Sequence, residues 1–139
     1  FQYITDSSYI TLIKITRNSL AVGIKEVKLG NQIGDISRAI QKYVESQNFN
    51  VVRELCGHGI GKEIHEPPQI LNYGKEGTGP ELVEGMFFCL EPMVTAGDWR
   101  IKKSSDGFGL KTKDGSLSAH FEQTIAVTKN GCQVLTDLK

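Results

Sequence analysis

Apolar residues in the first third of the chain recur every three or four positions, with polar and charged residues between them. This period predicts an amphipathic helix over residues 7–27, with Asp6 as its N-cap. After a turn around Gly30, the same period predicts a second amphipathic helix over residues 33–47. Neither helix carries candidate chemistry, so we interpret both as packing elements.

From Asn50 onward the pattern changes to short apolar or β-branched runs bounded by glycine, asparagine and proline. Such runs predict β-strands. The predicted strands cover residues 51–52, 86–90, 124–127 and 132–135. Residues 72–84 and 95–114 are predicted to be surface loops. Helices first and mostly antiparallel strands later predict an α+β fold, in which the two helices cover one face of a curved sheet.

Length and composition limit the class of protein. A chain of 139 residues can bury one hydrophobic core, so we expect a single domain over residues 1–139. Sixteen basic and sixteen acidic side chains give zero net charge, which argues against a specific nucleic-acid partner. The apolar runs are far shorter than the roughly 20 residues of a membrane-spanning helix, so no membrane association is expected. Three widely spaced cysteines indicate a reducing compartment, and we expect a cytoplasmic location.

The densest cluster of reactive residues lies between Cys56 and Pro68, where alternating glycines surround His58 and precede His65. Each glycine disfavours a helix by roughly 1 kcal/mol, which argues against two metal-binding histidines on one helical turn. The spacing does not fit a phosphate-binding P-loop either. In an extended or looped segment, glycines would let the backbone approach a metal or substrate while the two histidines are presented to it.

Two glutamates lie in or directly after predicted strands. Glu91 follows the apolar run 86–90 and precedes Pro92, so its side chain should point inward. Glu122 lies inside the strand-like run 119–127. Charged groups in such places are unfavourable unless they are paired or bind a metal. Exposed strand residues, or a buried ion pair with a lysine, would explain the same pattern without a metal.

One imidazole and two carboxylates form a mixed nitrogen and oxygen site, which suits Mn, Fe, Co, Ni or Zn. Carboxylates can bridge two such ions, which together activate a water and polarise a carbonyl, so hydrolysis is the natural reaction class. Two ions need about four to six protein donor groups, and one histidine with two glutamates is too few. The residues alone therefore predict an incomplete site.

Several motifs occur together along the chain. They are Gly57-His58-Gly59-Ile60-Gly61, His65-Glu66-Pro67, Glu91-Pro92-Met93-Val94, Asp106-Gly107-Phe108, Lys111-Thr112-Lys113-Asp114, Ser116-Leu117-Ser118-Ala119 and Glu122-Gln123-Thr124. With them the chain closely resembles the C-terminal part of the type I methionine aminopeptidases. The resemblance implies the pita-bread metalloprotease fold, truncated at its N-terminus. Residues 1–139 would then form a catalytic domain that lacks its N-terminal part.

The resemblance implies a metal-dependent aminopeptidase that removes the N-terminal methionine from nascent polypeptides when the next residue is small. Divalent metal ions, two in the complete enzyme, would be the cofactors, with Co, Mn, Fe, Ni and Zn as candidates. The complete enzyme would be a cytoplasmic monomer, and association with the ribosome is a further expectation. A non-catalytic relative that keeps the fold as a peptide- or protein-binding module is the alternative.

The resemblance also implies roles for particular residues. His58, Glu91 and Glu122 match metal ligands of the family, and Glu91 would also act as the general base. His65 matches a catalytic histidine that contacts the substrate and helps to stabilise the tetrahedral intermediate.

The chain departs from the family pattern at several positions. Ile64 and Phe108 would line the pocket for the methionine side chain, but the family has Phe and Trp there, which predicts a reshaped pocket. Gln123 stands where a histidine is usual. Two aspartate ligands and a further catalytic histidine of the family lie upstream of Phe1 and have no counterpart here. Cap, helix or loop positions, and not the site, are expected for Asp6, Asp35, Asp98, Asp106 and Asp114.

Overall fold

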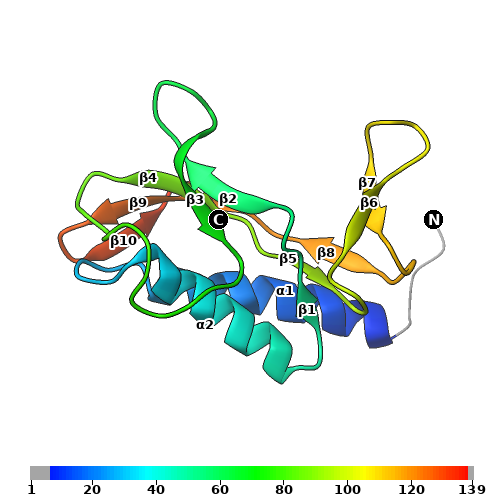
Figure 1. Ribbon diagram of the computed structural model, residues 1–139. Helices are drawn as coiled ribbons and strands as arrows, with labels where there is room; N and C mark the ends of the chain where they lie inside the picture. Colours follow the sequence, from blue (N-terminus) through cyan, green and yellow to red (C-terminus); the bar gives the residue numbers. More distant parts are fainter. Residues whose placement is uncertain (1–6, 138–139) are drawn as a thin grey trace.

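The computed structural model describes residues 7–137, which form two helices and ten short strands (Figure 1). The helices are α1 (Ser7–Lys25) and α2 (Ile33–Ser46). The strands are β1 (Asn50–Val51), β2 (Cys56–Gly59), β3 (Glu66–Leu71), β4 (Phe87–Leu90), β5 (Met93–Thr95), β6 (Ile101–Lys103), β7 (Leu110–Thr112), β8 (Ser118–His120), β9 (Gln123–Thr128) and β10 (Gly131–Val134). Both helices lie against one face of the sheet, whereas the β2–β3 loop and the β6–β7 hairpin project from the other (Figure 1).

The two helices begin and end close to the positions that the apolar period predicts. At the start of α2, the backbone N–H of Gln32 donates to Asp35 Oδ2 at 2.7 Å. Asp35 also accepts a hydrogen bond from the N–H of Gly77, and the two bonds lower the pKa of its carboxyl. Asp35 is therefore a capping residue, whereas Asp6 lies outside the described residues. Neither described helix is long and apolar enough to cross a membrane.

The central sheet has five strands in the order β10-β9-β4-β2-β3, and a second sheet has the order β1-β5-β8. Every pairing in both sheets is antiparallel, as the α+β prediction requires. The four predicted strands correspond to β1, β4, β9 and β10. The predicted surface excursion over residues 95–114 contains a hairpin of β6 and β7, which the sequence pattern did not predict. Strands of only three residues with charged positions carry no apolar run that would reveal them.

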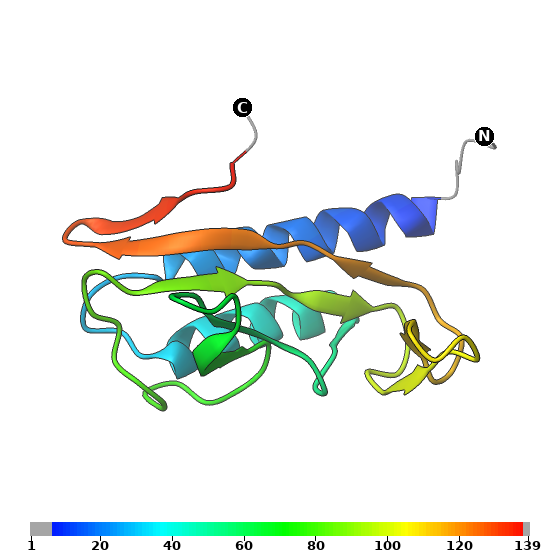
Figure 2. The same ribbon diagram turned by 90° about the horizontal axis from the view of Figure 1, so that it is seen from above.

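Two pairs of strands join into one long antiparallel ribbon. β4 continues into β5, and β8 continues into β9 (Figure 2). Residues 91–92 separate β4 from β5 and lie opposite residues 121–122, which separate β8 from β9, and these four residues form a break in the ribbon. Leu90 pairs with Gln123 on one side of the break, and Met93 pairs with His120 on the other. The register is therefore the same on both sides, and the residues within the break remain opposite one another.

Alternate residues of the ribbon face the helices and form the core with them. Phe88, Leu90 and Ile125 on the ribbon, and Ile36 and Ile40 on α2, are each at most 1% exposed. Burying a side chain of this kind stabilises the fold by about 1.5–3 kcal/mol. Because successive side chains of a strand point to opposite faces, the residues between them face away from the helices. The candidate site lies on that second face.

Candidate metal centre

Two glutamates lie opposite each other at the break in the ribbon. Glu91 follows β4 and Glu122 precedes β9, and the unchanged register pairs these two positions. The N–H of Phe121 donates to the carbonyl oxygen of Pro92 at 3.3 Å, so the strands stay joined there. The Glu91 side chain is only 15% exposed, in agreement with its predicted inward direction. Glu122 is exposed and lies in the break, so the prediction that it lies inside a strand is wrong.

His58 enters the site from β2, which approaches its neighbours closely at two glycines. A Cβ atom at Gly57 would collide with the carbonyl oxygen of Cys89, and one at Gly59 would collide with the carbonyl oxygen of Pro67. The alternating glycines were expected to permit close approach to a metal or substrate. Their nearest neighbours are instead the backbones of β4 and β3, so the glycines place His58 by letting the strands pack.

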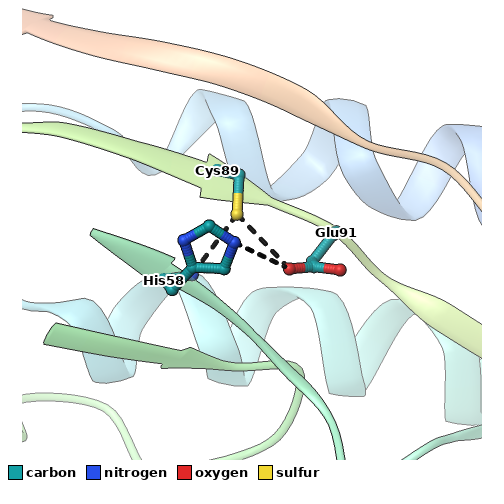
Figure 3. A group of neighbouring side chains, drawn as sticks. All are labelled: His58, Cys89 and Glu91. Carbon is teal, nitrogen blue, oxygen red and sulfur yellow. Dashed lines mark hydrogen bonds and ion pairs between the residues drawn. The ribbon is translucent and has the colours of Figure 1, made fainter. Parts of the chain in front are cut away.

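His58, Cys89 and Glu91 form one contact group (Figure 3). The backbone N–H of His58 donates to Cys89 Sγ at 3.3 Å, and the thiol donates to Glu91 Oε1, also at 3.3 Å. His58 Nε2 lies 3.7 Å from the same carboxylate oxygen. Cys89 has no exposed surface, and its burial, together with the nearby Glu91, raises the pKa of the thiol to about 12. The thiol therefore stays protonated near neutral pH and acts as a hydrogen-bond donor that orients Glu91.

The ring of His58 is oriented as in a metal-binding histidine. Its Nδ1 lies 3.0 Å from the carbonyl oxygen of Gly59. Because a carbonyl oxygen only accepts hydrogen bonds, Nδ1 carries the hydrogen, and Nε2 of the neutral ring keeps a free lone pair. That lone pair faces Glu91 Oε1, and two electron-rich atoms attract each other only through a proton or cation between them. The contact is therefore compatible with either a proton or a bound metal ion between the two atoms.

His120 is a second imidazole at Glu91, and the sequence pattern did not single it out. It ends β8, and its Nε2 lies 3.3 Å from Glu91 Oε2. Within residues 7–137 these two imidazoles are the basic side chains that approach Glu91, and no lysine or arginine pairs with it. A signal was available, because His120 and Glu122 are two residues apart in an extended segment and therefore share a face.

Potential ligand atoms gather into two groups that share Glu91. One group joins Glu91 with His58 and Cys89. The other joins it with His120 and Glu122, and in each group the ligand atoms lie within 4.8 Å of one another. Imidazole nitrogens and carboxylate oxygens are the donors that Mn, Fe, Co, Ni and Zn accept. The donor chemistry of the described residues therefore fits a divalent metal ion.

The loop between β2 and β3 carries two more of the predicted site residues. The ring of His65 lies beside that of His58, with 4.1 Å between the ring centroids. A pocket of about 520 Å³ opens there, and its lining consists of Cys56, His58, His65, Glu66, Pro67 and Gln69. Ile64 is 72% exposed and does not line this pocket, so its role in binding methionine stays a prediction.

Phe108 lies at the tip of the β6–β7 hairpin, where it is 95% exposed. Asp106 shapes this tip by accepting hydrogen bonds from the N–H groups of Phe108 and Gly109, at 2.9 and 2.8 Å. Asp114 accepts backbone hydrogen bonds in a turn of its own. Both aspartates are turn residues, as expected. The role of Phe108 in a methionine pocket stays a prediction, since it does not line the pocket at His58.

The chain resembles known proteins over most of its length. Residues 3–129 match metallopeptidase family M24. The methionine aminopeptidase of Salmonella typhimurium is 54% identical over 125 residues, which are 90% of this chain and 47% of that protein. The methionine aminopeptidase of Clostridium acetobutylicum is 49% identical, over 90% of this chain and 50% of that protein. The chain therefore spans about half the length of the curated relatives it matches.

Solved structures share the fold. The crystal structure of methionine aminopeptidase from Thermotoga maritima matches with a TM-score of 0.94 at 49% identity, over 96% of this chain and 54% of that one. That from Rickettsia prowazekii has a TM-score of 0.92 at 47% identity, over 95% and 54%. Prolidase from Pyrococcus furiosus, at 20% identity and a TM-score of 0.73, shares the fold alone. The predicted pita-bread fold and the resemblance to methionine aminopeptidases are thus confirmed, and the chain belongs to metallopeptidase family M24.

Proposed function

We propose that this chain supplies the metal-binding half of a methionine aminopeptidase, which removes methionine from the N-termini of nascent polypeptides when the next residue is small. The observation that carries the proposal is the approach of His58 Nε2 to Glu91 Oε1 at 3.7 Å, with Glu122 opposite Glu91 at the break in the ribbon. Support comes from relatives of 49% and 54% identity that bear the name methionine aminopeptidase.

Three side chains are proposed to hold the metal: His58 through Nε2, and Glu91 and Glu122 through their carboxylates. A divalent ion bound there would polarise a peptide carbonyl and lower the pKa of a water. Co, Mn, Fe, Ni and Zn all suit these donors, and we propose two ions in the complete enzyme. The three residues are too few for two ions, so further ligands would come from residues outside this chain.

Glu91 is also the proposed general base. The hydrogen bond from Cys89 to Oε1 fixes the orientation of the carboxylate, which accepts a proton from the attacking water and delivers it to the leaving amine. His65 stands beside His58 at the rim of the pocket, where it can donate a hydrogen bond to the oxygen that gains charge on the scissile carbonyl. The substrate peptide would therefore lie across the β2–β3 loop.

Ile64 and Phe108 are proposed to contact the methionine side chain. Both are strongly exposed, and their loops project from the sheet face that carries Glu91 (Figure 1). Covering such apolar surface with a thioether side chain would be favourable. A nascent polypeptide substrate places the enzyme in the cytoplasm, near the ribosome, and we propose that the complete enzyme acts as a monomer. The cysteines of the described chain are free thiols, which suits that compartment.

The test compares the chain alone with a fusion in which the N-terminal segment of the Salmonella typhimurium relative precedes Phe1. Each protein is incubated with a Met-Ala-Ser peptide and Co²⁺ or Mn²⁺, with and without EDTA, and released methionine is quantified. We expect EDTA-sensitive release by the fusion, loss of that release in its His58→Ala variant, and little release by the chain alone.

A folded fusion that binds metal but releases no methionine would refute the aminopeptidase function. Binding of the uncleaved Met-Ala-Ser peptide, measured by calorimetry, would then support the alternative of a peptide-binding module. Full activity of the chain alone would contradict the inference that its metal site is incomplete.

A further inference from the structure

His120 faces the metal centre from the last position of β8, and neither the proposed mechanism nor the resemblance gives it a role. We propose that His120 is a metal ligand, and that with Glu91 and Glu122 it binds a divalent cation on the side of Glu91 that lies away from His58. This inference rests on the proposed metal-dependent function and deepens it. It adds a second imidazole to a site for which the sequence supplied only one.

The geometry of the three side chains suits one ion. Their potential ligand atoms all lie within 4.8 Å of one another. Two donors bound to the same ion at about 2.0–2.2 Å stand at most about 4.4 Å apart, so only small side-chain rotations are needed. The His120 side chain is 46% exposed and Glu122 is exposed, which leaves both free to make that adjustment. The backbone of His120 is fixed by its pairing with Met93.

The two carboxylates at the break, Glu91 and Glu122, also favour a bound cation. The register places the Glu91 and Glu122 positions directly opposite, an arrangement that is unfavourable for two like charges. In the described part of the chain, neither carboxylate forms an ion pair with a lysine or arginine. A divalent ion between the carboxylates, with the neutral imidazole of His120 as a third donor, removes this repulsion.

The two carboxylate oxygens of Glu91 lie near different histidines. His58 Nε2 approaches Oε1 at 3.7 Å, whereas His120 Nε2 approaches Oε2 at 3.3 Å. Each oxygen of one carboxylate therefore has its own imidazole. His120 would thus be a metal donor on the Oε2 side of Glu91, whereas His58 would be a donor on the Oε1 side.

A simple ion pair between protonated His120 and Glu91 is the competing explanation, and metal binding separates the two. In an ion pair, His120 competes with the metal for Glu91, so its removal leaves the metal affinity unchanged or higher. As a ligand, His120 contributes a bond, so its removal lowers the affinity. The two explanations predict opposite signs.

The experiment titrates Co²⁺ into the chain and into its fusion with the relative's N-terminal segment, each as wild type and as His120→Gln, His120→Ala, His58→Ala and Ser118→Ala variants, by calorimetry and by the visible absorption of bound Co²⁺. Ser118 is exposed on the same strand and is the matched control. Thermal unfolding verifies that each variant folds. We expect Ser118→Ala to bind like the wild type, whereas both His120 variants lose about 10-fold or more in affinity at one of two sites. X-ray absorption of the Co²⁺ complex should count one imidazole fewer in His120→Gln.

Unchanged or tighter Co²⁺ binding by folded His120 variants, with the imidazole count preserved, would overturn the inference. If His58→Ala still weakens binding in that case, the proposed function stands without this role for His120. If the wild-type chain and the fusion with the relative's N-terminal segment both fail to bind Co²⁺, the metal-dependent function itself is refuted, and the role of His120 with it.

Discussion

Replacing Cys89 with alanine tests whether a buried thiol orients the proposed general base. The thiol accepts the backbone N–H of His58 and donates to Glu91 Oε1, each at 3.3 Å. Alanine removes both hydrogen bonds at a position with no solvent exposure. Serine keeps a donor and an acceptor in nearly the same volume, so Cys89→Ser is the conservative comparison.

The magnitude follows from the lost partners. A buried N–H without an acceptor is unfavourable by about 1–3 kcal/mol, so Cys89→Ala should lower the free energy of unfolding by that amount. Glu91 also loses the donor that fixes its carboxylate, and removing such a supporting bond weakens metal binding about 10–100-fold. Urea unfolding gives the first quantity, and Mn²⁺ titration by calorimetry gives the second. Cys89→Ser should retain most of both.

Cys132→Ala is the matched control, because this thiol is half-buried on β10 and bonds to the carbonyl oxygen of Ile24, outside the site. It should leave Mn²⁺ affinity unchanged. If folded Cys89→Ala binds Mn²⁺ as tightly as the wild type, the thiol does not orient Glu91. If Cys89→Ser loses as much affinity as Cys89→Ala, hydrogen bonding is not the cause.

Three further substitutions probe separate parts of the structure. Gly57→Ala should destabilise the chain by about 1–3 kcal/mol in urea unfolding, because the new Cβ would collide with the Cys89 carbonyl oxygen; wild-type stability would contradict that close approach. His65→Ala in the fusion with the relative's N-terminal segment should lower methionine release but not Mn²⁺ affinity, and equal loss of both would refute its assignment to the substrate. Backbone N–H groups of Asp98 and Ser116 lower the pKa of Asp114 to about 2. Because this folded-state pKa lies below the ordinary aspartate value of 3.8, the stabilisation by Asp114 is present above about pH 4 and is lost as the pH falls through about 2. Asp114→Asn should therefore lower the melting temperature more at pH 7 than at pH 2, and a pH-independent difference would show that ionisation is not the cause.

The helices could be predicted from the sequence because each must bury one apolar face against the sheet. Ile36, Ile40 and Val44 recur on one face of α2 and are at most 1% exposed, so the apolar period records their burial directly. The strands β6 and β7 could not be predicted in this way. They are three residues long and are mostly exposed, so backbone pairing holds them and leaves little trace in side-chain polarity.

The site could be predicted only in part, for a similar reason. His58 and Glu91 were recognisable because glycines and a proline mark unusual backbone around them. Cys89 lies in the apolar run 86–90, and the hydrophobic pattern does not distinguish a buried thiol from a buried apolar side chain. His120 lies within the predicted strand-like run 119–127, but nothing in that run marks it as a site residue. It contacts Glu91, which follows β4 on the other strand of the ribbon.

The break in the ribbon links the errors at Glu122 to the chemistry of the site. A continuous strand over residues 119–127 would have kept Glu122 within the regular ladder, opposite Glu91. The chain instead interrupts both strands at one level while it keeps their register. The two carboxylates therefore remain opposite each other but leave the regular ladder, where they can turn towards a shared cation. Glu91 and Glu122 lie at this departure from regular structure, and an apolar pattern, which reports regular structure, does not reveal it.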